Sequence, residues 1–185
     1  MTFSKIRVVA LVAATVNAVA IADTVTLAPQ DGVTTNVLSL FTGDTAVEVA
    51  GLGIVKLNNS NLHTGGTTLS GGTLVISGNI PAGGPSPVGT GTFTVSGGTL
   101  RGTGTFGGDI TGTGDFTIEA PNGFVLSGNN AFGGKITIAD GTLGIAGGTT
   151  AFSQHLYMTG TSAYSQTGGA VTMDANNVQL AYGND

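Results

Sequence analysis

Residues 65–74 read GGTTLSGGTL, and residues 133–143 read GGKITIADGTL. The two stretches match when one residue is inserted into the second, as a turn allows. A looser copy, GTGTFTVSGGTL, covers residues 89–100. So much Gly disfavours a helix, whereas Thr and branched apolar residues favour strands. The same words recurring about every 21–26 residues are typical of a solenoid, in which each copy forms one coil.

Side chains between the glycines alternate in character. In TFTVS (residues 92–96), DFTIE (115–119) and KITI (135–138), the apolar residues occupy every second position. A period of two predicts strands with one buried face. Beyond residue 22, no window spaces its apolar residues as an amphipathic helix does, so we expect almost no helix.

We therefore predict an all-β fold, a right-handed parallel β-helix (β-solenoid), with its repeats over residues 51–185. An antiparallel β-sandwich is also consistent with the closely spaced turn signals. A sandwich does not require the same sequence motif to recur at the same interval, so the repeats favour the solenoid. Residues 23–50 show no clear repeat and are expected to form an N-terminal cap or an irregular first coil. Residues 81–87, PAGGPSP, lack backbone donors at their prolines and are expected to bulge from a corner as a loop.

The first 22 residues have the pattern of a secretory signal peptide. Lys5 and Arg7 precede an apolar run over residues 8–16, and the small residues that follow suit cleavage after Ala22 or Ala20. The apolar run is too short to span a bilayer. The mature chain is therefore expected to be secreted or held at the cell surface, and the lack of Cys does not fit a disulfide-stapled domain.

The mature chain is acidic and poor in charge. Charged residues make up 8% of the sequence, against about 25% in an average protein. Removing residues 1–22 leaves three cations, Lys56, Arg101 and Lys135, and all ten acids, so the net charge is 3 − 10 = −7. Such a chain does not bind nucleic acid by neutralising phosphates, and it has no basic patch for anionic lipid.

The repeats resemble the autotransporter-associated β-strand repeat, also called the passenger-associated transport repeat. That family reads as Leu-x-Leu-x-Gly-x-Asn, an aromatic residue, Gly-Gly-Thr-Thr and then Gly-Thr-Leu. Residues 55–74 follow this pattern, with Leu62-His63 where an aromatic is common. Residues 125–134 keep the aromatic, and residues 163–172 look like a further rung. The resemblance covers residues 51–185.

The resemblance implies a non-enzymatic passenger, secreted or exposed at the surface and associated with the outer membrane in an autotransporter, as in many adhesins. The implied partners are a host surface glycan or protein and, in a longer parent protein, a β-barrel translocator. Because nothing up to Asp185 supplies such a barrel, we interpret the sequence as a fragment or truncated copy of a longer repeat protein. The family assigns no catalytic, cofactor-binding or metal-binding residue and no cofactor.

The alternative function is a carbohydrate-active β-helix enzyme, a polysaccharide lyase or glycosidase. Its acids would be Asp109, Asp115 and Glu119. Asp115 and Glu119 are four residues apart, which is about 13 Å along a strand and beyond the roughly 5–9.5 Å that glycosidases use. A third hypothesis is ice binding through Thr-x-Thr pairs at residues 92/94, 103/105 and 111/113, although their spacing is uneven.

The remaining motifs are weak. Residues 102–107, GTGTFG, match GxGxxG, but the residues that follow do not suit the helix that dinucleotide binding needs. The Gly-Asp steps near residues 109 and 115 lack the tandem copies of calcium-binding β-rolls. His63 and His155 have no second ligand at metal spacing, so each is expected to be a solvated or hydrogen-bonded imidazole. The tyrosines are expected to stack within the coils; they are Tyr157, Tyr164 and Tyr182.

Overall fold

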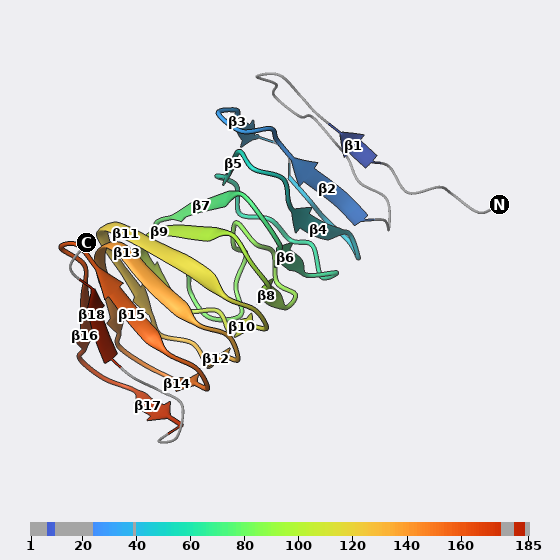
Figure 1. Cartoon of the computed structure of the whole chain (residues 1–185). Helices are drawn as coiled ribbons and strands as arrows, with labels where there is room; N and C mark the ends of the chain where they lie inside the picture. Colours follow the sequence, from blue (N-terminus) through green and yellow to red (C-terminus); the bar gives the residue numbers. More distant parts are fainter. Residues whose placement is uncertain (1–6, 10–23, 39, 175–179, 184–185) are drawn as a thin grey trace.

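The computed structural model describes residues 7–9, 24–38, 40–174 and 180–183. Within these ranges the chain contains no helix and winds into a parallel β-solenoid of about seven turns (Figure 1). The predicted all-β parallel solenoid is confirmed, and the antiparallel sandwich is excluded because consecutive strands of each sheet pair in parallel. The predicted signal peptide lies outside the described residues, except that residues 7–9 form a strand beside residues 24–28.

Two sheets run along the solenoid, and nearly every turn gives one strand to each. The first sheet contains, in spatial order, β1 (Arg7–Val9), β2 (Thr24–Ala28), β4 (Ala46–Val49), β6 (Thr67–Leu69), β8 (Phe93–Val95), β10 (Ile110–Gly112), β12 (Asn130–Phe132), β14 (Thr149–Phe152) and β17 (Ala170–Met173). The second sheet contains β3 (Thr34–Val37), β5 (Ile54–Leu57), β7 (Thr73–Ser77), β9 (Thr99–Phe106), β11 (Phe116–Leu126), β13 (Ile136–Ile145), β15 (Leu156–Thr159) and β18 (Leu180–Gly183), and β16 (Ala163–Gln166) also pairs with β13.

Alternate side chains of each strand point into the core, as the period of two predicts. One inward column of the second sheet stacks Val55, Leu74, Leu100, Ile118 and Ile138, all buried. Burying each such side chain contributes about 1.5–3 kcal/mol. The neighbouring outward column stacks Thr73, Thr99, Thr117 and Thr137. The narrow core therefore runs the length of the coils, with hydroxyls on its outer surface.

The stretch 65–74 supplies a corner, the strand β6, the next corner and the first two residues of β7. β6 buries Leu69 and β7 buries Leu74. Gly72 has φ = 65°, in the left-handed region that residues with a Cβ avoid. A Cβ at this position would also lie 2.6 Å from the carbonyl oxygen of Gly53 in the coil before. Glycine is therefore required here by both backbone conformation and coil stacking.

The predicted match of this stretch with residues 133–143 is wrong by part of a coil. Ladder pairing carries Leu74 through two intermediate strands to Ile138, so the true counterpart ends at residue 138. Leu143 lies further along the second sheet, where it pairs with Phe124. The tripeptide Gly-Thr-Leu recurs at two different corners: Gly72 and Gly98 directly precede β7 and β9, whereas Gly141 lies at the bend within β13, and all three glycines have positive φ.

The turns close in two ways. In the N-terminal coils (residues 24–92), the strands of the second sheet are four or five residues long, and longer segments complete each turn. In the C-terminal coils (residues 93–173), the strands β9, β11 and β13 have eight, eleven and ten residues, bend at register shifts and complete the turn themselves. The closing segments of the N-terminal coils include residues 40–45, 58–66 and 78–92.

Two segments without a clear repeat differ in structure: residues 23–50 contribute strands to the sheets, and residues 81–87 do not. Residues 23–50, expected to be a cap or an irregular first coil, contribute β2, β3 and β4 to the same two sheets as the repeats. Residues 81–87 form the predicted loop: in the described chain between β7 and β8 there is no strand. We call this segment the proline loop.

Candidate functional site

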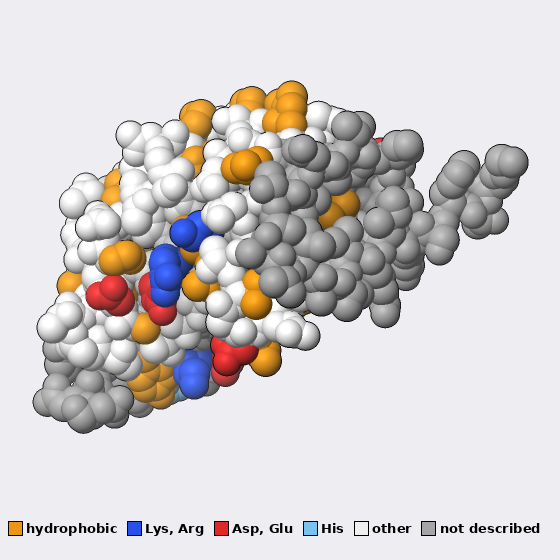
Figure 2. All heavy atoms as spheres, turned by 90° about the horizontal axis from the view of Figure 1, so that it is seen from above, with side chains coloured by type: hydrophobic (Ala, Val, Ile, Leu, Met, Phe, Trp, Pro, Cys, Tyr) orange, Lys and Arg blue, Asp and Glu red, His pale blue; other side chains and the backbone are white. Residues whose placement is uncertain are grey.

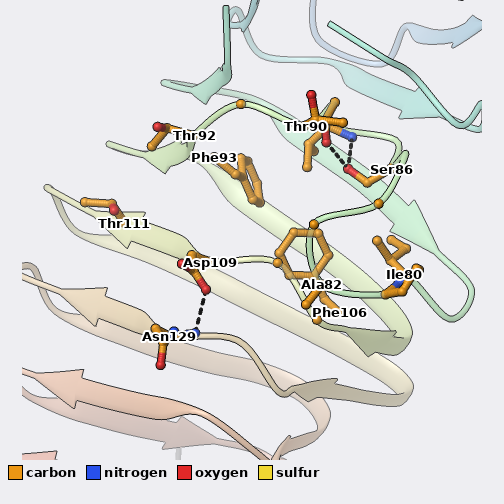
Figure 3. Close-up of a pocket in the computed structure, with 18 residues that line it drawn as sticks. Ile80, Ala82, Ser86, Thr90, Thr92, Phe93, Phe106, Asp109, Thr111 and Asn129 are labelled. Atoms are coloured by element: carbon orange, nitrogen blue, oxygen red, sulfur yellow. Dashed lines mark hydrogen bonds between the residues drawn. The ribbon is translucent and has the colours of Figure 1, made fainter. Parts of the chain in front are cut away.

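A hollow of about 620 Å³ lies where the proline loop leaves the stack of coils (Figure 3). Just before the loop, the N–H of Ile80 donates to the carbonyl of Thr105 in the next coil at 2.7 Å. After the loop, pairing with that coil resumes between Phe93 and Ile110. Between these two points the coils separate, and the hollow is the space that the loop leaves.

Polar side chains surround the mouth of the hollow, and two phenylalanines lie at its floor (Figure 3). Phe93 and Phe106 are 1% and 2% exposed, and their rings meet edge to face with centroids 5.9 Å apart. Asp109 is the only charged side chain among the lining residues, all of which belong to the described part of the chain. The exposed polar side chains at the mouth are those of Thr90, Thr92, Asp109, Thr111 and Asn129.

A ladder of side-chain hydrogen bonds fixes two of these groups. Asp109 Oδ1 accepts the backbone N–H of Asn129 at 2.7 Å. One coil further on, Asn129 Oδ1 accepts the backbone N–H of Thr149 at 3.2 Å and its hydroxyl at 3.1 Å. The N–H can only donate, so it fixes which end of the Asn129 amide is the oxygen. The other two polar atoms of these side chains, Asp109 Oδ2 and Asn129 Nδ2, form no hydrogen bond with any described residue.

The three acids considered for catalysis all have structural partners. Asp109 belongs to the ladder just described, and Asp115 Oδ1 accepts the backbone N–H of Lys135 at 2.8 Å. Glu119 Oε2 forms an ion pair with Arg101, whose Nη2 lies 2.5 Å away, and the two side chains are 26% and 39% exposed. Asp109 precedes β10 of the first sheet, whereas Asp115 and Glu119 lie at the start and on the outer face of β11 in the second. These carboxylates thus join neighbouring coils.

The GxGxxG match at residues 102–107 does not form a phosphate-binding loop. These residues run along β9 into the short connector before β10, whereas dinucleotide binding needs a glycine-rich turn that opens a helix. A Cβ at Gly102 would collide with the ring of Phe124 in the next coil. This glycine therefore makes room for an aromatic core residue.

His63 is fully buried and only half satisfied. Its Nε2 lies 2.9 Å from Thr67 Oγ1, which donates its own proton to the carbonyl of Val88, also at 2.9 Å. Nε2 must therefore carry the hydrogen, and Nδ1 is a bare acceptor with no partner among the described residues. The edge of the ring packs on Phe41, with centroids 5.8 Å apart. Burial lowers the pKa of His63 below its usual value of 6.5, so the imidazole is neutral.

The other histidine and the tyrosines lie near the C-terminal end. His155 stacks on Tyr157 with centroids 5.6 Å apart and planes 12° from parallel, and the Lys135 ammonium lies 5.7 Å from the Tyr157 ring. Tyr164 is partly buried against the core and donates to Gln166 Oε1 at 3.4 Å. Burial raises the pKa of Tyr164. Tyr182 belongs to β18, whose side chains lie outside the described ones.

The threonine pairs proposed for ice binding do not share one face. Thr94 lies in β8 and Thr111 in β10 of the first sheet, and their partners Thr92 and Thr113 lie just outside these strands. Residues 103/105 belong to β9 of the second sheet. The threonines that do stack form the outward column already described on the second sheet and a shorter column on the first sheet, made of Thr68, Thr94 and Thr111. A regular two-column threonine array is therefore not built from these pairs.

Charged side chains are few. Figure 2 shows blue and red side chains close together on a face that is otherwise mostly uncharged. Lys56, Arg101 and Glu119 all occupy outward positions of the second sheet, and Arg101 pairs with Glu119. The described residues contain no cluster of three or more His, Cys, Asp or Glu side chains suited to a metal ion.

Sequence reasoning identified Asp109 but missed its ladder and the hollow. Asp109, Asn129 and Thr149 are spaced by 20 residues; the first two directly precede β10 and β12, and Thr149 is the first residue of β14. This common spacing is the sequence pattern that could have predicted the ladder. The hollow itself depends on how far the proline loop departs from the next coil, which no local pattern encodes.

In the described ranges, no helix is long and apolar enough to cross a membrane. Comparison of the chain with models of protein families, with curated proteins and with solved structures gave no match.

Proposed function

We propose that this chain is a non-enzymatic module of a secreted or surface-exposed passenger of autotransporter type, which displays or adheres through the long flank of its solenoid. The proposal combines the resemblance of residues 51–185 to the β-strand repeat with the parallel solenoid fold. The signal-like residues 1–22 supply the route of export.

The non-enzymatic function is supported by the structural role of the three acids that were considered for catalysis. Asp109 and Asp115 each accept a backbone N–H from the next coil, and Glu119 is paired with Arg101. A glycosidase needs two carboxyl groups about 5–9.5 Å apart across the scissile bond, and a lyase needs a base near an acidic sugar. Side chains that stabilise the coil stack are poor candidates for either role.

A solenoid of this composition suits display. Its outer surface carries stacked threonine hydroxyls and few charges, and its length grows by one coil spacing with each turn. An extended flank of hydroxyl and backbone groups makes many weak polar contacts with another surface. The partner class is therefore a host surface glycan or protein.

Binding and turnover measurements test the proposal together. The purified chain, labelled with a fluorophore, is titrated onto cultured epithelial cells and is separately incubated with pectin, alginate, xylan and cellulose. We expect saturable binding to cells and no release of reducing ends or unsaturated uronates. Release of either product, at a rate that falls in Asp109→Asn or Asp115→Asn, would establish the carbohydrate-active enzyme instead.

A further inference from the structure

We infer that the hollow beside the proline loop binds a neutral polyhydroxylated ligand, one or two sugar units of a glycan, through Asp109 and Asn129. The inference deepens the proposed function, on which it rests, by naming a site and a ligand class. The hollow has a volume of about 620 Å³, which lies within the roughly 300–1,000 Å³ typical of small-ligand sites.

The side chains of Asp109 and Asn129 are held in fixed orientations. The coil-to-coil bonds hold Asp109 by Oδ1 and Asn129 by Oδ1, at 2.7 Å from the Asn129 N–H and 3.2 Å from the Thr149 N–H. Each side chain is therefore fixed before a ligand arrives, which reduces the entropy lost on binding. The atoms left over are an acceptor, Asp109 Oδ2, and a donor, Asn129 Nδ2.

The free atoms of these two side chains are chemically complementary to a sugar. Asp109 and Asn129 occupy equivalent positions in adjacent coils, because the register pairs the residues that follow them. A sugar offers neighbouring hydroxyls, each able to donate and accept. One hydroxyl can donate to the carboxylate in a charge-assisted bond while the next accepts from the amide. Figure 3 shows both side chains on the same side of the hollow.

The rest of the lining also suits a sugar. Thr90, Thr92 and Thr111 add exposed hydroxyls, and the proline loop adds exposed Pro81 and Ala82 as apolar surface for the C–H face of a sugar ring. Among the lining residues there is no Lys or Arg to neutralise an anionic ligand. One carboxylate without further acids also does not make a metal site. A neutral polyol fits this set of groups best.

The test is a titration of the uniformly ¹⁵N-labelled chain, followed by its amide spectrum. The probes are four neutral oligosaccharides: maltohexaose, cellohexaose, xylohexaose and chitohexaose. We expect at least one probe to shift the amides of Thr92, Asn129 and Thr149. Shifts confined to other regions, or no shift with any of the four, would overturn the inference.

Two matched variants identify the site. Asp109→Asn keeps an oxygen for the Asn129 N–H but removes the charged acceptor, and we expect affinity to fall about tenfold or more. Asp115→Asn makes the same change at the other coil-to-coil bond, away from the hollow, and is expected to change affinity less than about twofold. Equal affinities of the two variants would contradict the assignment.

A third variant distinguishes the loss of a ligand contact from a folding defect. Asn129→Asp keeps Oδ1 for Thr149 and replaces the Nδ2 donor with a charged oxygen, so binding is expected to fall while the remaining amide spectrum stays unchanged. Binding by Asn129→Asp as tight as by the unaltered chain would contradict the inference.

The cell-binding measurement separates the two proposals. If the chain still binds cells but no oligosaccharide moves the amides of the hollow, the sugar site is wrong and the display function stands. If an oligosaccharide binds at the hollow and is cleaved, the site stands and the non-enzymatic function is wrong.

Discussion

The N-terminal and C-terminal coils share two sheets, but they differ in how the third side of each turn is completed and in which side chains fill the interior. In the N-terminal coils, buried polar side chains hold the closing segments, as Asn61 and His63 do. In the C-terminal coils the strands bend and aromatic rings fill the interior: Phe132 lies 5.6 Å from Phe116 and 5.4 Å from Phe152, between ring centroids.

The difference shows that the ladder, rather than the closure, defines this fold. Both halves keep the same parallel register and the same inward columns. The two halves carry different weaknesses, because a polar network is destabilised when one hydrogen-bond partner is removed and an aromatic core is destabilised when volume is lost. The proline loop and its hollow lie at the junction of the two kinds of coil.

The largest effect is expected in the aromatic stack. Phe132→Ala removes a ring that is 1% exposed, and we expect the free energy of unfolding to fall by about 3–5 kcal/mol. Urea unfolding followed by circular dichroism measures the loss. Phe132→Leu, which keeps most of the volume, should cost clearly less. A loss under about 1 kcal/mol for the alanine variant would show that the C-terminal coils do not depend on this packing.

A somewhat smaller effect is expected in the polar closure. Asn61 accepts the N–H of Phe41 at 2.9 Å and donates to the carbonyl of Pro87 at 2.7 Å, and it is 1% exposed. Asn61→Ala leaves both backbone groups buried without a partner, so we expect a loss of about 2–4 kcal/mol. The exposed Asn36→Ala is the control, with a change within about 0.5 kcal/mol. Equal effects of the two variants in urea unfolding would contradict the proposed closure.

Acid should weaken the N-terminal coils selectively. The pKa of His63 is lowered on folding, so below about pH 6.5 the unfolded chain takes up a proton that the folded chain does not. The stabilisation by neutral His63 is thus complete above this pH and is lost as the pH falls, by at most about 1.4 kcal/mol per pH unit.

The corresponding measurement compares urea unfolding at pH 7.5 and 5.0 for the unaltered chain, His63→Gln and His155→Gln. We expect His63→Gln to reduce the pH dependence, and His155→Gln is the matched variant at the other, partly exposed histidine. The same pH dependence in all three proteins would show that His63 does not control the closure.

The smallest effect concerns the ion pair outside both closures. Arg101 and Glu119 are partly exposed, so a double-mutant cycle with Arg101→Ala and Glu119→Ala should give a coupling below about 1 kcal/mol that decreases in 1 M NaCl. A larger coupling, or one that salt leaves unchanged, would make this outer pair part of the solenoid's main stabilisation.

Local patterns predicted the fold because the solenoid is built from local repeats. Alternation at residues 92–96 and 115–119 gave strands that the structure contains, and prolines marked the loop at residues 81–87. The register could not be predicted, because the same Gly-Thr-Leu words serve different corners and only pairing shows that Leu74 aligns with Ile138.

The candidate site was predicted only in part, because its side chains interact with residues of neighbouring coils. Asp109 stood out as an acid beside glycines, but its role depends on Asn129 in the next coil. The burial of His63 likewise follows from Phe41 and Val88, which lie in other coils. Contacts between coils at a spacing that varies with loop length cannot be deduced from one coil alone.

The central claim is that the acids considered for catalysis instead join neighbouring coils. Hydrogen exchange of the backbone amides of Asn129 and Lys135, which donate to Asp109 and Asp115, tests it most directly. The account predicts that both amides are protected in the unaltered chain, and that Asp109→Ala exposes the first and Asp115→Ala the second. Exchange of both amides at the rate of an unstructured peptide in the unaltered chain would contradict it.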